Sequence, residues 1–236
     1  MNPESSVVIG KLDSSRVRGL LFDVDGTLSD SDDRMIERLA HYFSPFRWLF
    51  KNNDVRPFAR TLVMAAETPG NFLYRLADRL GIDAIFLSLL GWSLKQRWLT
   101  RPNVGRLILI EGVREMLAGL AARYPIAIVS ARDANTTSQF LSYFKLEGYF
   151  KVVVTAQTCK HTKPYPEPVL SAAAQLGLSP EACVMIGDTV VDILAGKAAG
   201  AQTIAVLCGF GTLRELKRAK ADMILSTTAQ IVDIFG

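Results

Sequence analysis

Short apolar runs rich in β-branched residues alternate with helical patterns along most of this 236-residue chain. Four of the first five runs lack the polar–apolar alternation of a half-exposed strand, which is typical of strands buried on both faces of a parallel sheet. Strands that alternate with helices indicate a doubly wound α/β core, Rossmann-like in its layering. The runs are "VRGLLFDV" (17–24), "PIAIVSA" (125–131), "FKVVVTA" (150–156), "ACVMIGD" (182–188), "AQTIAVLCG" (201–209) and the shorter "ADMILS" (221–226).

One segment interrupts this alternation. Residues 30–107 show helical periodicity and no convincing strand, and about 78 residues are too many for a crossover within one sheet. We therefore predict an α/β core formed by residues 1–29 and 108–236, with an all-helical domain inserted at 30–107. Proline and glycine divide the insert into four expected helices, at 31–43, 55–67, 70–80 and 82–99. The core helices are expected at 112–124, 135–146, 166–178, 192–200 and 228–235.

Polar residues stand at or beyond the carboxyl ends of four predicted strands, where ligands of a parallel sheet bind. A single polar residue there is usually structural, but four strand ends that converge favour a functional site. Several carboxylates in one place call for a cation, and carboxylate oxygens suit Mg²⁺. An aspartate can also act as the nucleophile in phosphoryl transfer, with a lysine to offset negative charge and a hydroxyl to hold phosphate. The residues are Asp23, Asp25, Ser130, Lys163, Asp188 and, four residues further on, Asp192.

Four motifs in the right order resemble those of the haloacid dehalogenase-like hydrolase superfamily. The first is "DVDGT" at 23–27, and "IVSAR" at 128–132 is similar to the second, a strand that ends in Ser or Thr. The third, "TKPYPEPVL" at 162–170, has a Lys followed by Pro, and the fourth is "GDTVVD" at 187–192. The helical insert is similar to the cap domain of the phosphoglycolate phosphatase-like branch. The resemblance covers nearly the whole chain.

The resemblance implies a role for each matching residue. Asp23 would be the nucleophile and a Mg²⁺ ligand, and Asp25 would be the general acid and then the general base, with its backbone carbonyl on Mg²⁺. Asp188 would complete the metal site, and Asp192 would bind a metal water or orient Lys163. Lys163 would neutralise Asp23 and the phosphate. The phosphate-binding set would be Ser130, Ala131 and Lys163, with Gly26 and Thr27 of the turn, where glycine lets backbone amides approach an anion.

The predicted function is Mg²⁺-dependent hydrolysis of a small organic phosphomonoester through an aspartyl-phosphate, as in a phosphoglycolate phosphatase. Asp25 favours phosphate over a carbon–halogen bond, because the dehalogenase branch is not expected to keep an acid there. Two alternatives stay open. A phosphosugar mutase of the β-phosphoglucomutase type shares this residue set, and a non-catalytic binding protein could use the same fold with its apolar insert as a docking surface.

Other residues in these motifs have simpler interpretations. Asp30, Asp32 and Asp33 more plausibly begin the first helix of the insert, where negative charge is favourable. Lys160 is an alternative to Lys163, which is preferred for the proline that follows it. Cys159 and His161 lie in the same loop but lack the further ligands of a zinc site.

Composition limits the remaining classes of function. The net charge of +4 is concentrated in residues 31–110, which either face an anionic substrate or form a solvated helix surface. No basic block with interleaved aromatics favours nucleic acid, so the expected partner is a small phosphorylated metabolite. Three unpatterned cysteines, no signal-peptide pattern and no apolar stretch of membrane-spanning length predict a cytoplasmic protein, a monomer or homodimer.

Overall fold

A computed structural model describes residues 8–30, 40–50, 54–55 and 108–236. The chain divides into two compact units, 1–32 with 106–236, and 33–105. The first unit contains the sheet. The chain leaves and re-enters it through a short paired stem, in which the Asp30 N–H donates to the Ile108 carbonyl at 2.8 Å and the Ile110 N–H to the Leu28 carbonyl at 3.0 Å. The stem pairs residues 28–30 with residues 108–110.

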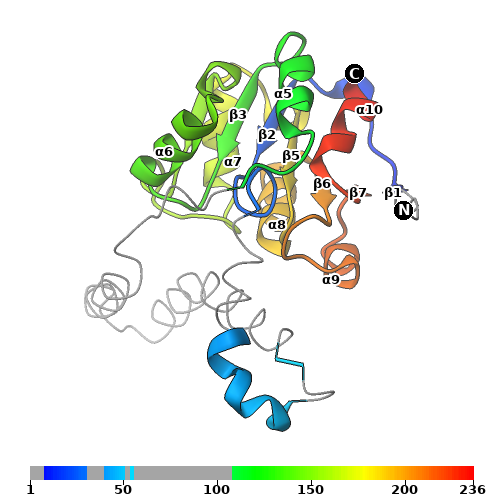
Figure 1. Cartoon of the computed structure of the whole chain (residues 1–236). Coiled ribbons are helices and arrows are strands. Elements are labelled where there is room, and N and C mark those ends of the chain that lie inside the picture. Colours follow the sequence, from blue (N-terminus) through cyan, green and yellow to red (C-terminus); the bar gives the residue numbers. More distant parts are fainter. Residues whose placement is uncertain (1–7, 31–39, 51–53, 56–107) are drawn as a thin grey trace, which may run out of the picture. The chain divides into compact units, whose positions relative to one another are not determined.

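The first unit contains a seven-stranded sheet in the order β1-β7-β6-β5-β2-β3-β4 (Figure 1). All neighbouring pairs are parallel except β1 and β7. The six predicted runs supply β2 to β7, so the predicted α/β fold is confirmed. The strands are β1 (Val8–Gly10), β2 (Gly19–Phe22), β3 (Ile126–Val129), β4 (Val152–Val154), β5 (Cys183–Gly187), β6 (Gln202–Val206) and β7 (Met223–Leu225).

The antiparallel strand β1 was not predicted. Its three residues are too few to show a period, and they lie at an edge of the sheet, where Val8 is about half exposed. The predicted parallel sheet therefore has one additional antiparallel edge strand, a common arrangement in α/β folds.

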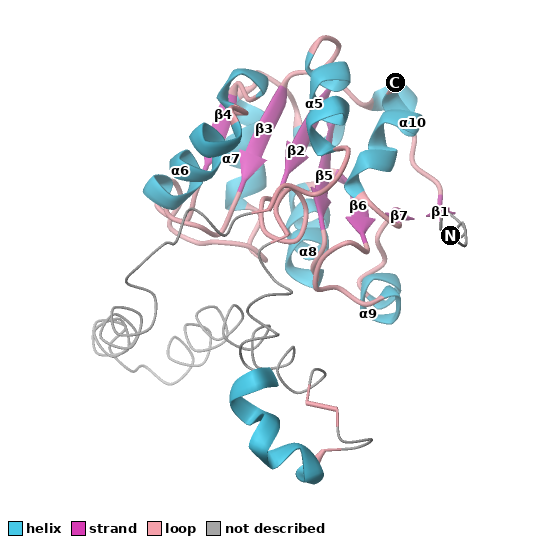
Figure 2. Cartoon of the chain, viewed as in Figure 1, coloured by secondary structure: helices cyan, strands magenta, loops and turns pink. Residues whose placement is uncertain are grey.

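Helices cover both faces of the sheet (Figure 2). On one face α5, α6 and α10 pack against Leu20 and Phe22 of β2, and on the other α7 and α8 pack in a cluster that includes Leu21. All residues of β2 and β5 are buried because both faces are covered, which explains why these runs show no alternation. The α-helices described in the first unit are α5 (Val113–Ala121), α6 (Ala134–Phe144), α7 (Glu167–Gln175), α8 (Val190–Ala199), α9 (Leu213–Arg218) and α10 (Val232–Phe235).

Two helical regions differ from prediction. The short helix α9 was not predicted; it begins at a capping box in which Thr212 and Glu215 bind each other's backbone N–H groups. The expected closing helix is divided into a 3-10 helix, η7, and α10. The 3-10 helices of the first unit are η1 (Ser14–Arg16), η5 (Glu147–Tyr149), η6 (Pro180–Ala182) and η7 (Thr228–Ile231).

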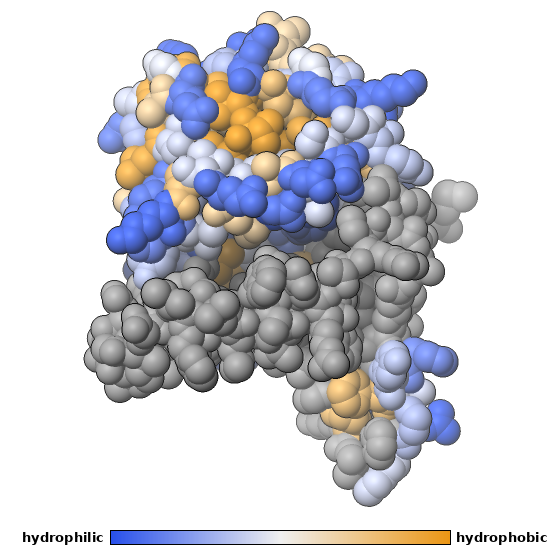
Figure 3. All heavy atoms as spheres, turned by 90° about the vertical axis from the view of Figure 1, so that its left-hand side faces the viewer, coloured by the Kyte–Doolittle hydropathy of each residue, from blue (hydrophilic) through white to orange (hydrophobic). Residues whose placement is uncertain are grey.

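The β4 edge of the sheet carries apolar surface. Figure 3 views the core from the side on which α6 and β4 lie, and apolar residues gather there among charged ones. Val153 of β4 and Leu170 of α7 are each 39% exposed. An edge strand of three residues is short, which limits pairing with other chains.

Only a small part of the second unit is described. Residues 40–43 are helical and lead into the 3-10 helix η2 (Ser44–Leu49), on which Trp48 is 71% exposed. The predicted helices at 55–67, 70–80 and 82–99, most of the helix at 31–43, and the start of a helix at Asp32 and Asp33 lie outside the described residues. Among the residues that are described, no helix is both long and apolar enough to cross a membrane.

Candidate active site

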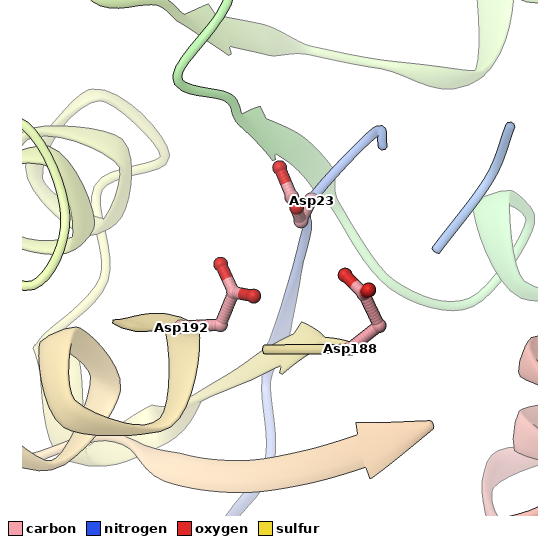
Figure 4. Close-up of side chains that lie close together, drawn as sticks. All are labelled: Asp23, Asp188 and Asp192. Atoms are coloured by element: carbon pink, nitrogen blue, oxygen red, sulfur yellow. The ribbon is translucent and has the colours of Figure 1, made fainter. Parts of the chain in front are cut away.

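Four neighbouring strands bring the predicted residues to one edge of the sheet. Asp23 follows β2, Ser130 follows β3 and Asp188 follows β5, while Lys163 comes from the loop after β4. Parallel strands that lie side by side end at the same edge, so residues far apart in sequence become neighbours. Figure 4 shows the carboxylates of Asp23, Asp188 and Asp192 gathered there.

Lys163 lies at the centre of this group. Its Nζ is 2.8 Å from Asp23 Oδ1 and 2.6 Å from Asp192 Oδ1, and no more than 9% of any of the three side chains is exposed. Lys160, the alternative considered from sequence, is exposed. Lys163 is therefore the lysine of this loop that contacts the acids.

Asp192 is held at both carboxylate oxygens. Oδ1 accepts from Lys163, while Oδ2 accepts from the Thr189 backbone N–H at 3.0 Å and from the Thr189 hydroxyl at 2.6 Å, within the capping box of α8. These contacts orient the Asp192 carboxylate beside Lys163, and a carboxylate oxygen with one hydrogen-bond partner can accept a second. They are compatible with both predicted roles of Asp192, binding a metal water and orienting Lys163.

Asp188 is fixed by two separate loops. Its Oδ2 accepts from the Phe210 backbone N–H at 2.7 Å, and its Oδ1 lies 3.3 Å from the Thr27 hydroxyl. A Cβ on Gly26 or on Gly209 would lie 2.2 Å from Asp188 Oδ2, so both positions need a residue without a side chain. The "GFGT" segment, residues 209–212, thus supports Asp188, a role that the sequence analysis did not assign.

The predicted phosphate-binding role of Gly26 and Thr27 gains no support from their hydrogen bonds. The Gly26 N–H donates to the Ser29 carbonyl at 2.8 Å and the Thr27 N–H to the Val24 carbonyl at 3.4 Å, so both close the turn within the chain. Gly26 has a positive φ of 72°, which glycine adopts without strain. The close approach of Asp188 and the shape of the turn explain this glycine better than an anion does.

Asp25 and Ser130 both contact Arg132, which the sequence analysis did not single out. Asp25 forms an ion pair with the Arg132 guanidinium, and the Ser130 hydroxyl accepts from the Arg132 backbone N–H at 3.1 Å. Asp25 is partly exposed, whereas Ser130 is buried and Ala131 is exposed. No sequence motif distinguishes an Arg that stands two residues after the Ser at a strand end. The contact of Arg132 with Asp25 is therefore visible only in the fold.

Burial dominates the electrostatics of the site. It raises the pKa of Asp23 from 3.8 to about 7, with Asp192 and Asp25 adding to the rise and Lys163 opposing it. Burial alone would lower the pKa of Lys163, but the carboxylates of Asp192 and Asp23 outweigh it and raise that pKa. Lys163 therefore stays charged, while Asp23 is only partly ionised near neutral pH unless another cation lies close to it.

The acidic group fits a divalent cation. Asp23, Asp188 and Asp192 place potential ligand atoms within 4.8 Å of one another, and all three are buried. When all three are ionised, Lys163 balances only one of the negative charges. Buried charge that is not balanced is costly, and a hard cation with oxygen ligands would remove that cost.

The comparisons with known proteins agree with this geometry. Residues 92–206 match the family model described as "Haloacid dehalogenase-like hydrolase". Over 232 residues the chain is 30% identical to a phosphoglycolate phosphatase of Nitrosococcus oceani, with 92% of this chain and 96% of that protein covered. The chain belongs to the haloacid dehalogenase-like hydrolases. The predicted family and its enzyme class, a phosphatase, are thereby confirmed.

One further relative and one solved structure extend the comparison. This hydrolase is 30% identical over 227 residues to a pyrophosphatase PpaX of Bacillus mycoides, covering 94% of this chain and 98% of that protein. Among solved structures it resembles a predicted phosphatase from Clostridium acetobutylicum, with a TM-score of 0.69, 20% identity, and 92% and 98% of the two chains covered. At that identity the structural likeness supports the fold alone.

Proposed function

We propose that this hydrolase is a Mg²⁺-dependent phosphatase that cleaves small phosphomonoesters through an aspartyl-phosphate on Asp23. The observation that carries the proposal is the buried contact between Asp23 and Lys163 at the sheet edge, beside Asp188 and Asp192. A structural ion pair has no need of two further buried acids, whereas a nucleophile that meets a phosphate needs balanced charge around it.

Asp23 would attack phosphorus in the first step. A bond forms between one Asp23 oxygen and phosphorus, and the bond from phosphorus to the leaving oxygen breaks. Lys163, only 2.8 Å from Asp23 Oδ1, would hold the carboxylate in place and offset the charge of the arriving phosphate. Ser130 and the backbone amide of Ala131 would bind phosphate oxygens.

Asp25 would move the protons of both steps. As a carboxylic acid it would protonate the leaving oxygen, and as a carboxylate it would then take a proton from the water that attacks the phosphorylated Asp23. Its partial exposure suits a group that exchanges protons with water.

The metal would be held by Asp23, Asp188 and the backbone carbonyl of Asp25, with Asp192 acting through water. Bound there, Mg²⁺ would supply positive charge that favours ionised Asp23 and stabilises the charge on the transferring phosphoryl group. Asp188 suits this role because two loops fix its orientation.

The names of the relatives suggest the type of substrate. One is called a phosphoglycolate phosphatase and the other a pyrophosphatase, so a small phosphorylated metabolite is the substrate that we propose. No described contact favours a mutase or a non-catalytic binding protein. Action in the cytoplasm, as a monomer or homodimer, stays a prediction.

The proposal predicts that metal removal abolishes activity. Purified protein should release phosphate from an aryl phosphate and from members of a phosphate-ester panel in Mg²⁺. Excess EDTA should reduce the rate by at least about 10³-fold, because Asp23 loses its balancing charge, and Mg²⁺ should restore it. Asp188→Asn should need more Mg²⁺ for half-maximal rate. Equal rates with and without metal would contradict the proposal. A protein that hydrolyses no ester of the panel, and whose phosphoenzyme loses its phosphate only to a sugar phosphate, would be a mutase and would also contradict it.

A further inference from the structure

Arg132 makes a two-pronged contact with Asp25. Arg132 Nε donates to Asp25 Oδ2 at 2.6 Å, and Nη2 donates to Oδ1. The planar guanidinium and the planar carboxylate form two parallel hydrogen bonds, so the pair holds one defined relative orientation. The side chains are 16% and 27% exposed, which leaves them within reach of a small molecule. The proposed chemistry gives Arg132 no role.

The position of Arg132 is well fixed. Its backbone N–H donates to the Ser130 hydroxyl at 3.1 Å, and its carbonyl accepts from the Ala156 N–H at 2.9 Å. Its guanidinium lies over the ring of buried Phe140, with 5.5 Å between the guanidinium carbon and the ring centroid. Because the guanidinium is already held in place, it would lose little conformational entropy when it binds an anion.

The contact with Arg132 also occupies Asp25. Each Asp25 oxygen accepts a hydrogen bond from the guanidinium, yet the proposed reaction needs an Asp25 oxygen at the leaving group. As the general acid Asp25 carries a proton, and a neutral carboxyl holds a guanidinium less strongly than a carboxylate does, so we expect the pair to open during turnover. Opening is least costly when another anion replaces Asp25 on Arg132, because the guanidinium then keeps a partner.

From these contacts we propose that Arg132 binds a negatively charged group on the leaving portion of the substrate. This inference rests on the proposed phosphatase function and narrows its substrates to phosphate esters or anhydrides whose leaving group is itself anionic. Asp25 acts at the leaving oxygen in the proposed chemistry, and among the residues that the structure describes Arg132 is a cation in direct contact with Asp25, which brings it close to the leaving group. A carboxylate or a second phosphate fits the planar fork of Arg132.

The exchange leaves the chemistry balanced. Arg132 gives up Asp25 and takes the anion of the substrate, without gaining or losing a proton. Asp25, which carries a proton taken from hydronium or buffer in the solvent, gives that proton to the leaving oxygen as the bond from phosphorus to that oxygen breaks. The leaving group departs with its anion, and Asp25 then takes a proton from the water that attacks phosphorus as the bond to Asp23 breaks. When Asp25 has returned this proton to the solvent, Arg132 pairs again with the ionised carboxylate.

A matched pair of substrates tests this inference. Phosphoglycolate and 2-hydroxyethyl phosphate have leaving groups of similar size, but only the first carries a carboxylate. We expect the wild type to prefer phosphoglycolate by about 10²-fold in kcat/KM, since loss of a charged partner costs this order of discrimination. Arg132→Gln should abolish the preference, mainly through a higher KM for phosphoglycolate, and Arg132→Lys should restore part of it. Pyrophosphate, whose leaving group is also anionic, should show the same loss of kcat/KM in Arg132→Gln as phosphoglycolate.

The controls separate specificity from damage. Arg123→Gln removes an exposed charge of the same type and should change neither rate. For 2-hydroxyethyl phosphate, whose leaving group offers Arg132 no anion, Arg132→Gln should lower kcat/KM much less than it does for phosphoglycolate. An equal loss for both esters, or no preference in the wild type, would overturn the inference. Turnover of aryl phosphate alone would also overturn it yet leave the phosphatase function standing, whereas no turnover of any phosphate would remove both.

Discussion

Replacing Asp23 by Asn is expected to reduce steady-state phosphatase turnover by at least about 10⁴-fold, comparable to removal of a nucleophile from other hydrolases. The amide keeps the size and place of the carboxylate but cannot form the covalent bond to phosphorus. Steady-state release of phosphate from an aryl phosphate at saturating Mg²⁺ measures the effect. Asp233→Asn makes the same change at an exposed position of α10 and should leave the rate unaltered.

The fold of this variant should be intact. Burial raises the pKa of Asp23 from 3.8 to about 7, so the ionised group destabilises the folded protein increasingly as pH rises from near 4 to 7. Asn removes that cost. In metal-free buffer the melting temperature of Asp23→Asn should therefore equal or exceed that of the wild type above pH 7, and the difference should disappear near pH 4. Retained turnover, or a collapse in melting temperature, would show that Asp23 is a structural acid.

Replacing Lys163 by Met is expected to have the largest effect on stability. The ammonium lies 2.8 Å from Asp23 and 2.6 Å from Asp192, and its removal leaves both carboxylates buried without it. Loss of one partner from such a group typically costs about 3 to 5 kcal/mol in the free energy of unfolding. Urea denaturation in metal-free buffer measures the loss, and turnover should fall with it.

A second variant shows whether charge is the cause. Lys163→Met combined with Asp192→Asn removes one of the stranded carboxylates and should recover part of the lost stability. Lys160→Met changes an exposed lysine of the same loop and should alter stability by no more than about 0.5 kcal/mol. If Lys163→Met is no less stable than Lys160→Met, the Lys163 ammonium does not stabilise the fold by balancing the buried carboxylates of Asp23 and Asp192.

The parallel strands were predictable because both of their faces are buried. A fully covered strand such as β5 must be apolar throughout, and that pattern is visible in sequence. The end of each strand then placed Asp23 and Asp188 at one edge. In contrast, β1 is three residues long with a partly exposed pattern, and its pairing depends on β7, more than two hundred residues away.

The contacts that orient the acids were not predictable in the same way. Asp188 is held by the backbone N–H of Phe210, and a backbone donor leaves no signature in residue type. Gly209 is needed because a Cβ at this position would lie 2.2 Å from Asp188 Oδ2. This close approach becomes visible only when the two loops are placed together in the fold. Arg132 reaches Asp25 across 107 positions of sequence. Strand ends can thus be read from the chain, whereas the surroundings of each side chain require the fold.

If catalysis passes through a phosphorylated Asp23, an Asp25→Asn variant should accumulate that phosphorylated enzyme. The aryl phosphate 4-nitrophenyl phosphate has a leaving group that departs as a stable anion without a proton, so this variant should still phosphorylate Asp23 but lack the base that activates water. Rapid mixing with Mg²⁺ should release one equivalent of 4-nitrophenolate per active site in a burst, and mass mapping should find the phosphate on the peptide that contains Asp23. Absence of both burst and label while the wild type turns over, or a label on another residue, would show that the reaction does not pass through a phosphorylated Asp23.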